Sequence, residues 1–262
     1  MPPEDALMTR SLPWRKKARR QRLADAPWPQ AWDDILTETT HASVLVADQQ
    51  TKWRRLIRVL IAEKKWDGCD GLTITDTVKV TIASQAALMI LEMPHDYFSG
   101  IRSIVVFPSA FELLQEEWQE KPGRALGLAP YDAVLLAWDT VATHSRKLWT
   151  GRNLVIHEFA HHLDFEDGYT NGRPVLPDKS QCVQWREVMS AAFAKLSRDL
   201  SNGCDILFRY SAGDNPTEFF AEASERFFTV PLKLRHFYPA VYDVLERYYG
   251  LKTIEWFGRH IT

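Results

Sequence analysis

The residues most able to do chemistry lie close together in the second half of the chain. His157, Glu158 and His161 follow the order His-Glu-x-x-His, in an apolar run without glycine or proline between Asn153 and Asp167. That run predicts a helix, on which residues four apart share one face, about 6 Å apart along the axis. Two imidazoles at this spacing can bind one zinc ion, and a neighbouring carboxylate can take a proton from a water that the metal activates. The motif therefore predicts metal-assisted peptide hydrolysis.

A second interpretation treats both histidines as core residues whose polar atoms are satisfied by hydrogen bonds. Matches with three fixed positions also occur by chance in proteins that bind no metal. The apolar flanks favour the metal site, because glutamate and histidine are costly to bury unless something pairs them. These flanking residues are Leu154, Val155, Ile156, Phe159, Ala160 and Leu163.

A catalytic zinc ion normally has three protein ligands and one water, so a third ligand must come from elsewhere in the chain. The extended metzincin motif would need glycine at position 164 and histidine at position 167, where this chain has Asp164 and Asp167. A second helix is the next source to consider. Asp214 or Asn215 can cap such a helix, and Pro216 suits its first position.

Glu218, Glu222 and Glu225 share a face of this second helix, at positions i, i+4 and i+7. Glu218 is the predicted third ligand. Either Glu222 or Asp164 is predicted to hydrogen-bond a ligating histidine and orient it. Glu225 fits a solvated acidic stripe, which the helix dipole would favour near the helix N-terminus.

Tyr210 and His162 lie close to these motifs in the sequence. Hydrolysis needs a donor for the developing oxyanion besides the metal. Tyr210, eight residues before Glu218, is the best-placed phenol, although an ordinary loop tyrosine explains it equally well. His162 directly follows His161 and should point about 100° away from it, toward the surface.

The bulk composition bounds the class of protein. With 262 residues, 45% of them hydrophobic, the chain is long enough for a full core, in one large domain or in a catalytic domain with a smaller companion. Its 32 basic and 34 acidic residues nearly balance, which gives no support for direct nucleic-acid binding. Three widely spaced cysteines argue against a disulfide framework and fit a reducing cytoplasm. No run of about 18 apolar residues and no apolar signal core occurs, so we expect neither a membrane span nor export.

The first 24 residues form a basic segment. A basic amphipathic arm can lie on an anionic membrane or bind an acidic partner. A mobile, solvated arm is the commoner outcome, and residues 1–24 are predicted to be one. The basic residues are Arg10, Arg15, Lys16, Lys17, Arg19, Arg20 and Arg22.

Hydrophobic periodicity and turn residues predict the elements that position the motifs. Together they predict an α+β zincin-like domain over residues 25–262, with a small mixed sheet and active-site helices. Its N-terminal part, about 25–66, is mainly helical, and its catalytic part spans about 67–262. The predicted elements are two or three helices within 25–66, two short strands within 72–82, a helix over 83–92, a strand over 103–107, a loop-rich stretch over 108–130, a strand over 133–138, the histidine helix, a loop over 167–174, a helix over 183–200 and the acidic helix from 216.

The strand over 133–138 lies shortly before the histidine helix. In zinc peptidases of this general type, a strand close to that helix binds the peptide substrate by backbone pairing. A core strand without any contact to substrate fits the sequence equally well.

The two motifs together resemble the Mlc titration factor A (MtfA) peptidase family. The resemblance rests on residues 154–168, Tyr210 and residues 215–222, and it extends upstream to 13–15, 98–108 and 135–140. The same motifs resemble the catalytic domain of anthrax lethal factor, which has a gluzincin type of site. This chain has one residue more between Tyr210 and Glu218 than the family pattern, and residues 111–150 match only loosely.

The resemblance implies one zinc ion per chain, with His157, His161 and Glu218 as ligands. It further implies Glu158 as the general base and Tyr210 as the stabiliser of the oxyanion. The implied activity is that of an aminopeptidase-like bacterial enzyme acting on peptides. The implied partner is the glucose-responsive repressor Mlc, whose repression such a protein lifts by binding it.

A different class of function is a binding protein that sequesters a transcription regulator, with a structural or vestigial zinc site. A structural zinc site would have four protein ligands and no open position. Only three good ligands are visible in the sequence, which favours catalysis.

Overall fold

A small parallel sheet and the helices around it position the candidate site. The computed structural model describes residues 13–109, 132–147, 150–204 and 207–259. The α+β class is confirmed, although the described strands pair only in parallel, where a mixed sheet was expected. In the order of the sheet, the strands are β1 (Lys65–Gly68), β2 (Ser103–Phe107) and β3 (Ala133–Ala137).

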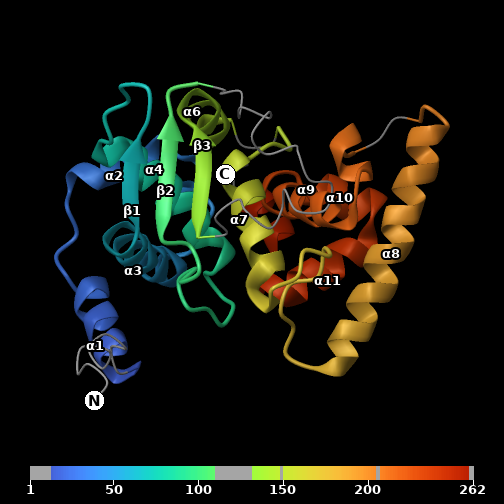
Figure 1. The fold of residues 1–262 in the computed structure, drawn as a ribbon, viewed down its shortest axis with the longest axis horizontal. Coiled ribbons are helices and arrows are strands. Elements are labelled where there is room, and N and C mark those ends of the chain that lie inside the picture. Colours follow the sequence, from blue (N-terminus) through green and yellow to red (C-terminus); the bar gives the residue numbers. More distant parts are fainter. Residues whose placement is uncertain (1–12, 110–131, 148–149, 205–206, 260–262) are drawn as a thin grey trace, which may run out of the picture.

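Helices make up most of the rest. In Figure 1 the sheet lies on one side of the molecule, α8 to α11 lie on the other, and α7 lies between them. The α-helices are α1 (Pro13–Ala24), α2 (Ala31–Thr37), α3 (Ala47–Glu63), α4 (Asp76–Met89), α6 (Trp138–Arg146), α7 (Leu154–Asp164), α8 (Lys179–Ser201), α9 (Pro216–Thr229), α10 (Pro231–Phe237) and α11 (Pro239–Tyr249). The 3-10 helices are η2 (Thr40–Ser43), η4 (Phe165–Asp167), η5 (Tyr210–Gly213) and η6 (Thr253–Arg259).

Strands β2 and β3 follow the sequence prediction closely. Ile104 pairs with Val134 and Val106 with Leu136, and all four side chains are buried, so one face of the sheet packs into the core. β3 is an end strand of the described sheet and contacts α7. Most of the loop-rich stretch predicted over 108–130 lies outside the described residues.

Residues 72–82 contain no strands, so the prediction for them is wrong. α4 begins here instead, capped by Thr75, whose hydroxyl accepts a hydrogen bond from the backbone N–H of Val78 at 3.4 Å. Every residue from Val80 to Met89 is buried. A helix buried on all sides has no polar face, so its β-branched residues imitated the alternation of a strand and hid the helical period.

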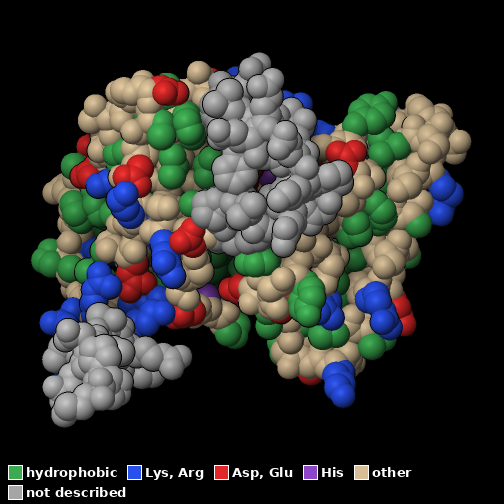
Figure 2. All heavy atoms as spheres, viewed as in Figure 1, with side chains coloured by type: hydrophobic (Ala, Val, Ile, Leu, Met, Phe, Trp, Pro, Cys, Tyr) green, Lys and Arg blue, Asp and Glu red, His purple; other side chains and the backbone are tan. Residues whose placement is uncertain are grey.

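The prediction of a mobile arm is wrong for residues 13–24, which form α1. The guanidinium of Arg20 is buried and contacts both carboxylate oxygens of Glu63 at 2.8–3.0 Å as well as Asp96. It also stacks on the ring of Tyr97, 4.5 Å from the ring centroid. Charge-assisted hydrogen bonds of this kind attach α1 to α3 and to the turn before β2. Lys and Arg side chains gather over this corner of the molecule, near α1 (Figure 2).

The packing of α7 against α9 connects the sheet side to the helices beyond it. Phe159 of α7 packs edge-to-face on Phe98, with the ring centroids 4.8 Å apart. On α9, Phe219, Phe220 and Phe227 are almost fully buried. These residues belong to one continuous hydrophobic cluster that includes the sheet and both helices. Within the described part of the chain, no helix has the length and apolar character needed to cross a membrane.

Candidate metal centre

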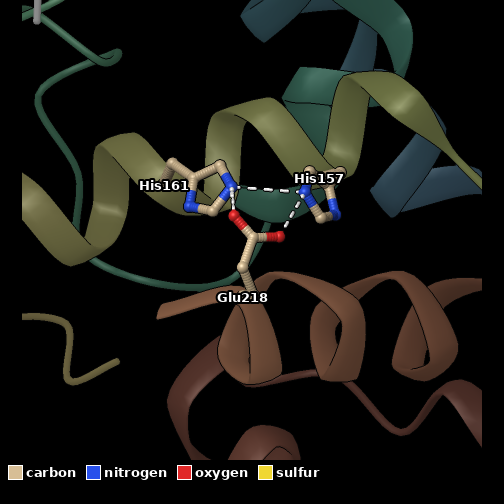
Figure 3. A group of neighbouring side chains, drawn as sticks. All are labelled: His157, His161 and Glu218. Atoms are coloured by element: carbon tan, nitrogen blue, oxygen red, sulfur yellow. Dashed lines mark hydrogen bonds and ion pairs between the residues drawn. The ribbon is translucent and has the colours of Figure 1, made fainter. Parts of the chain in front are cut away.

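Three side chains from two helices meet at one point. Nε2 of His157 lies 3.2 Å from Nε2 of His161 and 3.3 Å from Oε2 of Glu218. Nε2 of His161 lies 3.4 Å from Oε1 of Glu218 (Figure 3). The histidines come from α7 and the glutamate from α9, as the sequence predicted.

Local capping fixes where both helices begin. Asn153 caps α7, because its side-chain oxygen accepts a hydrogen bond from the N–H of Ile156 at 3.0 Å. Asn215 caps α9 in the same way, accepting from the N–H of Glu218 at 2.9 Å, with Pro216 at the first helical position. The predicted start of α9 is therefore confirmed, and Glu218 lies in its first turn.

The spacing of the three donors fits a tetrahedral metal ion. Zinc bonds of about 2.0–2.1 Å would separate the ligand atoms of a tetrahedron by about 3.3–3.4 Å. The separations here are 3.2–3.4 Å. Among the described residues, His157, His161 and Glu218 form the group whose ligand atoms are close enough together to hold a metal ion.

Charge at this cluster also favours a cation. Burial opposes protonation of His157, but the carboxylates of Glu218 and Glu225 outweigh it and raise the pKa of this imidazole to about 10. For Glu218, hydrogen bonds from both histidines overcome the effect of burial and hold its pKa well below the usual range. The cluster thus stabilises positive charge at the point where a metal ion would bind.

Glu225 orients the first histidine. Its Oε1 lies 2.7 Å from Nδ1 of His157, and its Oε2 accepts a hydrogen bond from the backbone N–H of Asn153 at 2.8 Å. With a metal ion bound in place of the Nε2 proton, a proton on Nδ1 in this contact would leave the lone pair of Nε2 for the ion. A carboxylate that holds the far nitrogen of a ligating histidine is a common feature of metal sites.

The orienting role predicted for Glu222 or Asp164 is therefore wrong for His157. Glu222 binds Arg209, Ser211 and Arg226 instead, at 2.8–3.0 Å. Asp164 is fully buried and accepts hydrogen bonds from the backbone N–H groups of residues 172 and 173.

The solvated stripe predicted for Glu225 is also wrong, because only 1% of this side chain is exposed. The available signal was its position seven residues after Glu218, on the same helical face. Phenylalanine and alanine surround it on α9, so this face had to pack against something. The sequence does not reveal that this face packs against the start of α7.

Glu158 lines the same cavity as His157 and Glu218. This cavity has a volume of about 560 Å³. Burial raises the pKa of the Glu158 carboxyl, with the two histidines opposing the change. The other described lining residues are Asp139, Thr140, Thr143, His144, Arg152, Leu154, Arg209, Ser211 and Glu225.

His144 and Arg209 are cavity residues that the sequence gave no reason to select. Nδ1 of His144 accepts a hydrogen bond from the N–H of Leu154 at 3.2 Å, so its proton is on Nε2. Burial lowers the pKa of His144, Glu225 counteracts this, and the charge of Arg152 lowers it further. His144 is therefore a neutral hydrogen-bond donor in the wall of the cavity.

Tyr210 and His162 lie away from the three donors. Tyr210 begins η5 and is 75% exposed, between Arg209 and Ser211, which both line the cavity. His162 is partly buried and lines a different pocket, near Phe98. The structure thus brings His157, His161 and Glu218 together at one point, with Glu158 in the lining of the adjoining cavity. Tyr210 belongs neither to this group nor to the described cavity lining.

Comparisons with known proteins find relatives that match most of this chain. Mlc titration factor A of Edwardsiella ictaluri is 29% identical over 90% of this chain and 91% of its own length. The protein of the same name in Yersinia pestis is 28% identical over 81% of this chain and 82% of its own length. "Uncharacterized protein slr2042" of Synechocystis sp. is 31% identical over 93% of this chain and 90% of its own length.

The resemblance to the MtfA peptidase family is thus confirmed, while the likeness to lethal factor stays a prediction. Residues 14–250 match the family described as glucose-regulated metallo-peptidase M90. Because this match spans most of the sequence, the chain belongs to the glucose-regulated metallo-peptidase M90 family.

Proposed function

We propose that this metallopeptidase-family protein is a zinc-dependent peptidase that hydrolyses peptide bonds with Glu158 as the general base. The observation that carries the proposal is the convergence of His157, His161 and Glu218, with 3.2–3.4 Å between their donor atoms. Three protein donors leave a fourth tetrahedral position for a water or a substrate. Glu158 follows His157 directly in α7 and lines the same cavity, so its carboxylate is available as the base.

Each group then has a specific task. When bound, zinc supplies a Lewis acid that makes water nucleophilic near neutral pH. Glu158 takes the proton of the attacking water and passes it to the leaving amine, and its raised pKa suits a base that must also act as an acid. Glu225 fixes the ring of His157, and the Nε2–H of His144 is a donor available to the substrate.

Tyr210 is proposed as an oxyanion donor on the strength of the family resemblance. Its exposed ring follows Arg209 in the chain and precedes Ser211, so it stands next to the cavity wall. The role stays a prediction.

The curated relatives named Mlc titration factor A motivate a second proposal. That name points to binding of an Mlc-type repressor, and we extend it to this chain together with aminopeptidase-like cleavage of peptides. Binding and hydrolysis need not use the same surface. A protein that only sequesters the repressor is the alternative function.

Glu158→Gln tests the proposal. The variant should keep the zinc content of the wild type, because Glu158 is not one of the three donors, and it should lose peptide cleavage by about 10²- to 10⁴-fold. Glu166→Gln, just after α7 and outside the cavity lining, is the matched control. Unchanged cleavage by Glu158→Gln would refute the assignment. Capture of an Mlc-type repressor by Glu158→Gln without hydrolysis would separate recognition from catalysis.

A further inference from the structure

A second pocket shares a wall with the metal cavity. It has a volume of about 550 Å³ and is lined by residues from the loop before α7, the segment before η5, and helices α9 and α10. Arg152 and Arg209 line both the pocket and the metal cavity. The two spaces are therefore adjacent, and we call the second one the basic pocket.

All the charged residues in the described lining of the basic pocket are positive. Four of its described lining residues are cationic, namely Arg152, Arg209, Arg226 and Lys233, and none is a carboxylate. The rest of the described lining is small or apolar, with Thr150, Gly151, Leu207, Phe208, Val230 and Phe237.

Two of the four cations are already neutralised from behind the pocket. Arg209 contacts Glu222 at 2.9 Å and Glu225 at 2.5 Å. Arg226 contacts Glu222 at 3.0 Å and Glu225 at 3.9 Å. Two buried carboxylates thus balance two guanidinium groups, and these four residues add no net charge to the pocket.

Arg226 also holds the pocket walls together. Its side chain is almost fully buried. Nε donates to the carbonyl oxygen of Leu207 at 3.0 Å, and Nη1 donates to the carbonyl oxygen of Gly151. One arginine therefore links the loop that carries Arg152 to the segment that carries Arg209, so the shape of the pocket is built into the fold.

Arg152 and Lys233 are the two uncompensated cations. Among the described residues, neither side chain forms an ion pair, and both residues are exposed. The charge of Arg152 reaches the metal cavity, because it contributes to lowering the pKa of His144. Two free cations beside apolar side chains suit a ligand with a short apolar stem and a negative end.

We propose that the basic pocket is a substrate subsite that binds a carboxylate, through Arg152 and Lys233, while the adjoining peptide bond lies in the metal cavity. The carboxylate is that of an Asp or Glu side chain or of the free C-terminus of a short peptide. This inference rests on the proposed peptidase function and adds a preference for anionic substrates to it.

Two pairs of peptides with one cleavable sequence test the subsite and identify the source of the carboxylate. One pair differs only by Glu or Gln near the cleaved bond, and the other only by a C-terminal acid or amide. The wild type should cleave the anionic member of at least one pair with a kcat/KM about 10-fold or more above its neutral partner, chiefly through KM. Equal values in both pairs would overturn the proposal.

Substitutions locate the preference. Lys233→Gln and Arg152→Gln should each reduce the anionic-to-neutral ratio by several fold, and the double variant should bring it close to one. Lys233→Arg should retain it. Arg235→Gln is the matched control, because Arg235 is on the same helix but pairs with Asp243 at 3.2 Å and does not line the pocket. A ratio that survives the double variant would overturn the proposal.

A binding measurement separates this inference from the proposed function. Calorimetry of each peptide pair with Glu158→Gln measures affinity without turnover. Tighter binding of the anionic member, weakened by the added Lys233→Gln change and lost when Arg152→Gln is added as well, supports the subsite even if the wild type cleaves none of the peptides. Equal binding of both members would overturn the subsite even if the wild type is an active peptidase.

Discussion

Oε1 of Glu225 lies 2.7 Å from Nδ1 of His157, while Oε2 of Glu218 lies 3.3 Å from Nε2 of the same ring. One helix, α9, therefore contacts both nitrogens of this histidine with carboxylates seven residues apart. Two turns of helix span about 11 Å, which lets α9 hold the ring from both sides. The position of α9 against α7 is thus the feature on which the candidate metal centre depends.

Glu225→Gln should weaken zinc binding by about 10- to 100-fold, because the ring of His157 loses its charged partner. Metal affinity is measured by competition with a chelator of known affinity. Glu222→Gln is the control, since Glu222 is equally buried on α9 but binds arginines rather than the histidine. Equal losses in the two variants would mean that disruption of the charge network, and not the histidine contact, is responsible.

Gly172→Ala should destabilise the fold and the site together. A Cβ at position 172 would lie 2.3 Å from the carbonyl oxygen of Pro216, two residues before Glu218, and the backbone there has φ of +75°. We expect a loss of about 1 kcal/mol from the left-handed backbone and about 1–3 kcal/mol more from the clash. Urea unfolding measures the sum of these two losses in the free energy of unfolding.

Gly168→Ala supplies the comparison for that substitution. Its φ is +87°, but nothing beyond its chain neighbours lies within 4 Å of the place that a Cβ would take, so only the backbone contribution of about 1 kcal/mol should appear. If the free energy of unfolding falls equally in the two alanine variants, the clash with Pro216 does not contribute to the loss at position 172.

Phe159→Ala should cost about 3–5 kcal/mol of unfolding free energy, because it leaves a cavity beneath α7. The Phe159 ring is 1% exposed and packs on Phe98. Tyr169→Ala, at a position that is 67% exposed, should change stability by no more than about 0.5 kcal/mol. A loss below about 1 kcal/mol for Phe159→Ala would show that α7 is not held by this contact.

His95 should make stability depend on pH. Burial, with the charges of Lys52 and Arg20 adding to it, lowers the pKa of this imidazole from 6.5 to about 4, and Asp96 opposes the change. Its Nδ1 accepts a hydrogen bond from the N–H of Tyr97 at 3.2 Å, which protonation would break. The unfolded chain takes up the proton first, so the wild type loses stability as the pH falls from about 6.5 to about 4.

His95→Asn keeps an acceptor at this position but cannot titrate in that range. The free energy of unfolding of the wild type relative to the variant should therefore fall by up to about 1.4 kcal/mol per pH unit across the window. Denaturant unfolding at several pH values measures this difference. A difference that stays constant with pH would refute the role of His95.

The parts of the site that depend on local sequence were predictable. His157, Glu158 and His161 occupy one helix with a clear cap, and the start of α9 is marked by Asn215 and Pro216. Helical spacing and capping are properties of a few adjacent residues, so the sequence contains them. The same holds for strand β2, which is bounded as predicted.

The parts of the fold and of the site that depend on tertiary packing could not be predicted from the sequence. The first half of α4 was taken for strands because the helix is buried on every side, while its second half was predicted as a helix. α1 was taken for a mobile arm because the sequence does not reveal that Arg20 pairs with Glu63 and Asp96. Glu225 was assigned to a solvated face for a similar reason. In each case the residues that the segment packs against lie far away in the sequence.

The zinc content of the purified protein tests the central claim most directly. After dialysis with zinc and removal of the excess, the wild type should hold one zinc ion per chain, because His157, His161 and Glu218 supply three ligands to a single ion. Glu218→Ala should retain almost none, while Glu222→Gln should retain most of it. A wild type that binds no zinc, or a Glu218→Ala variant that binds it as tightly as the wild type, would contradict the account.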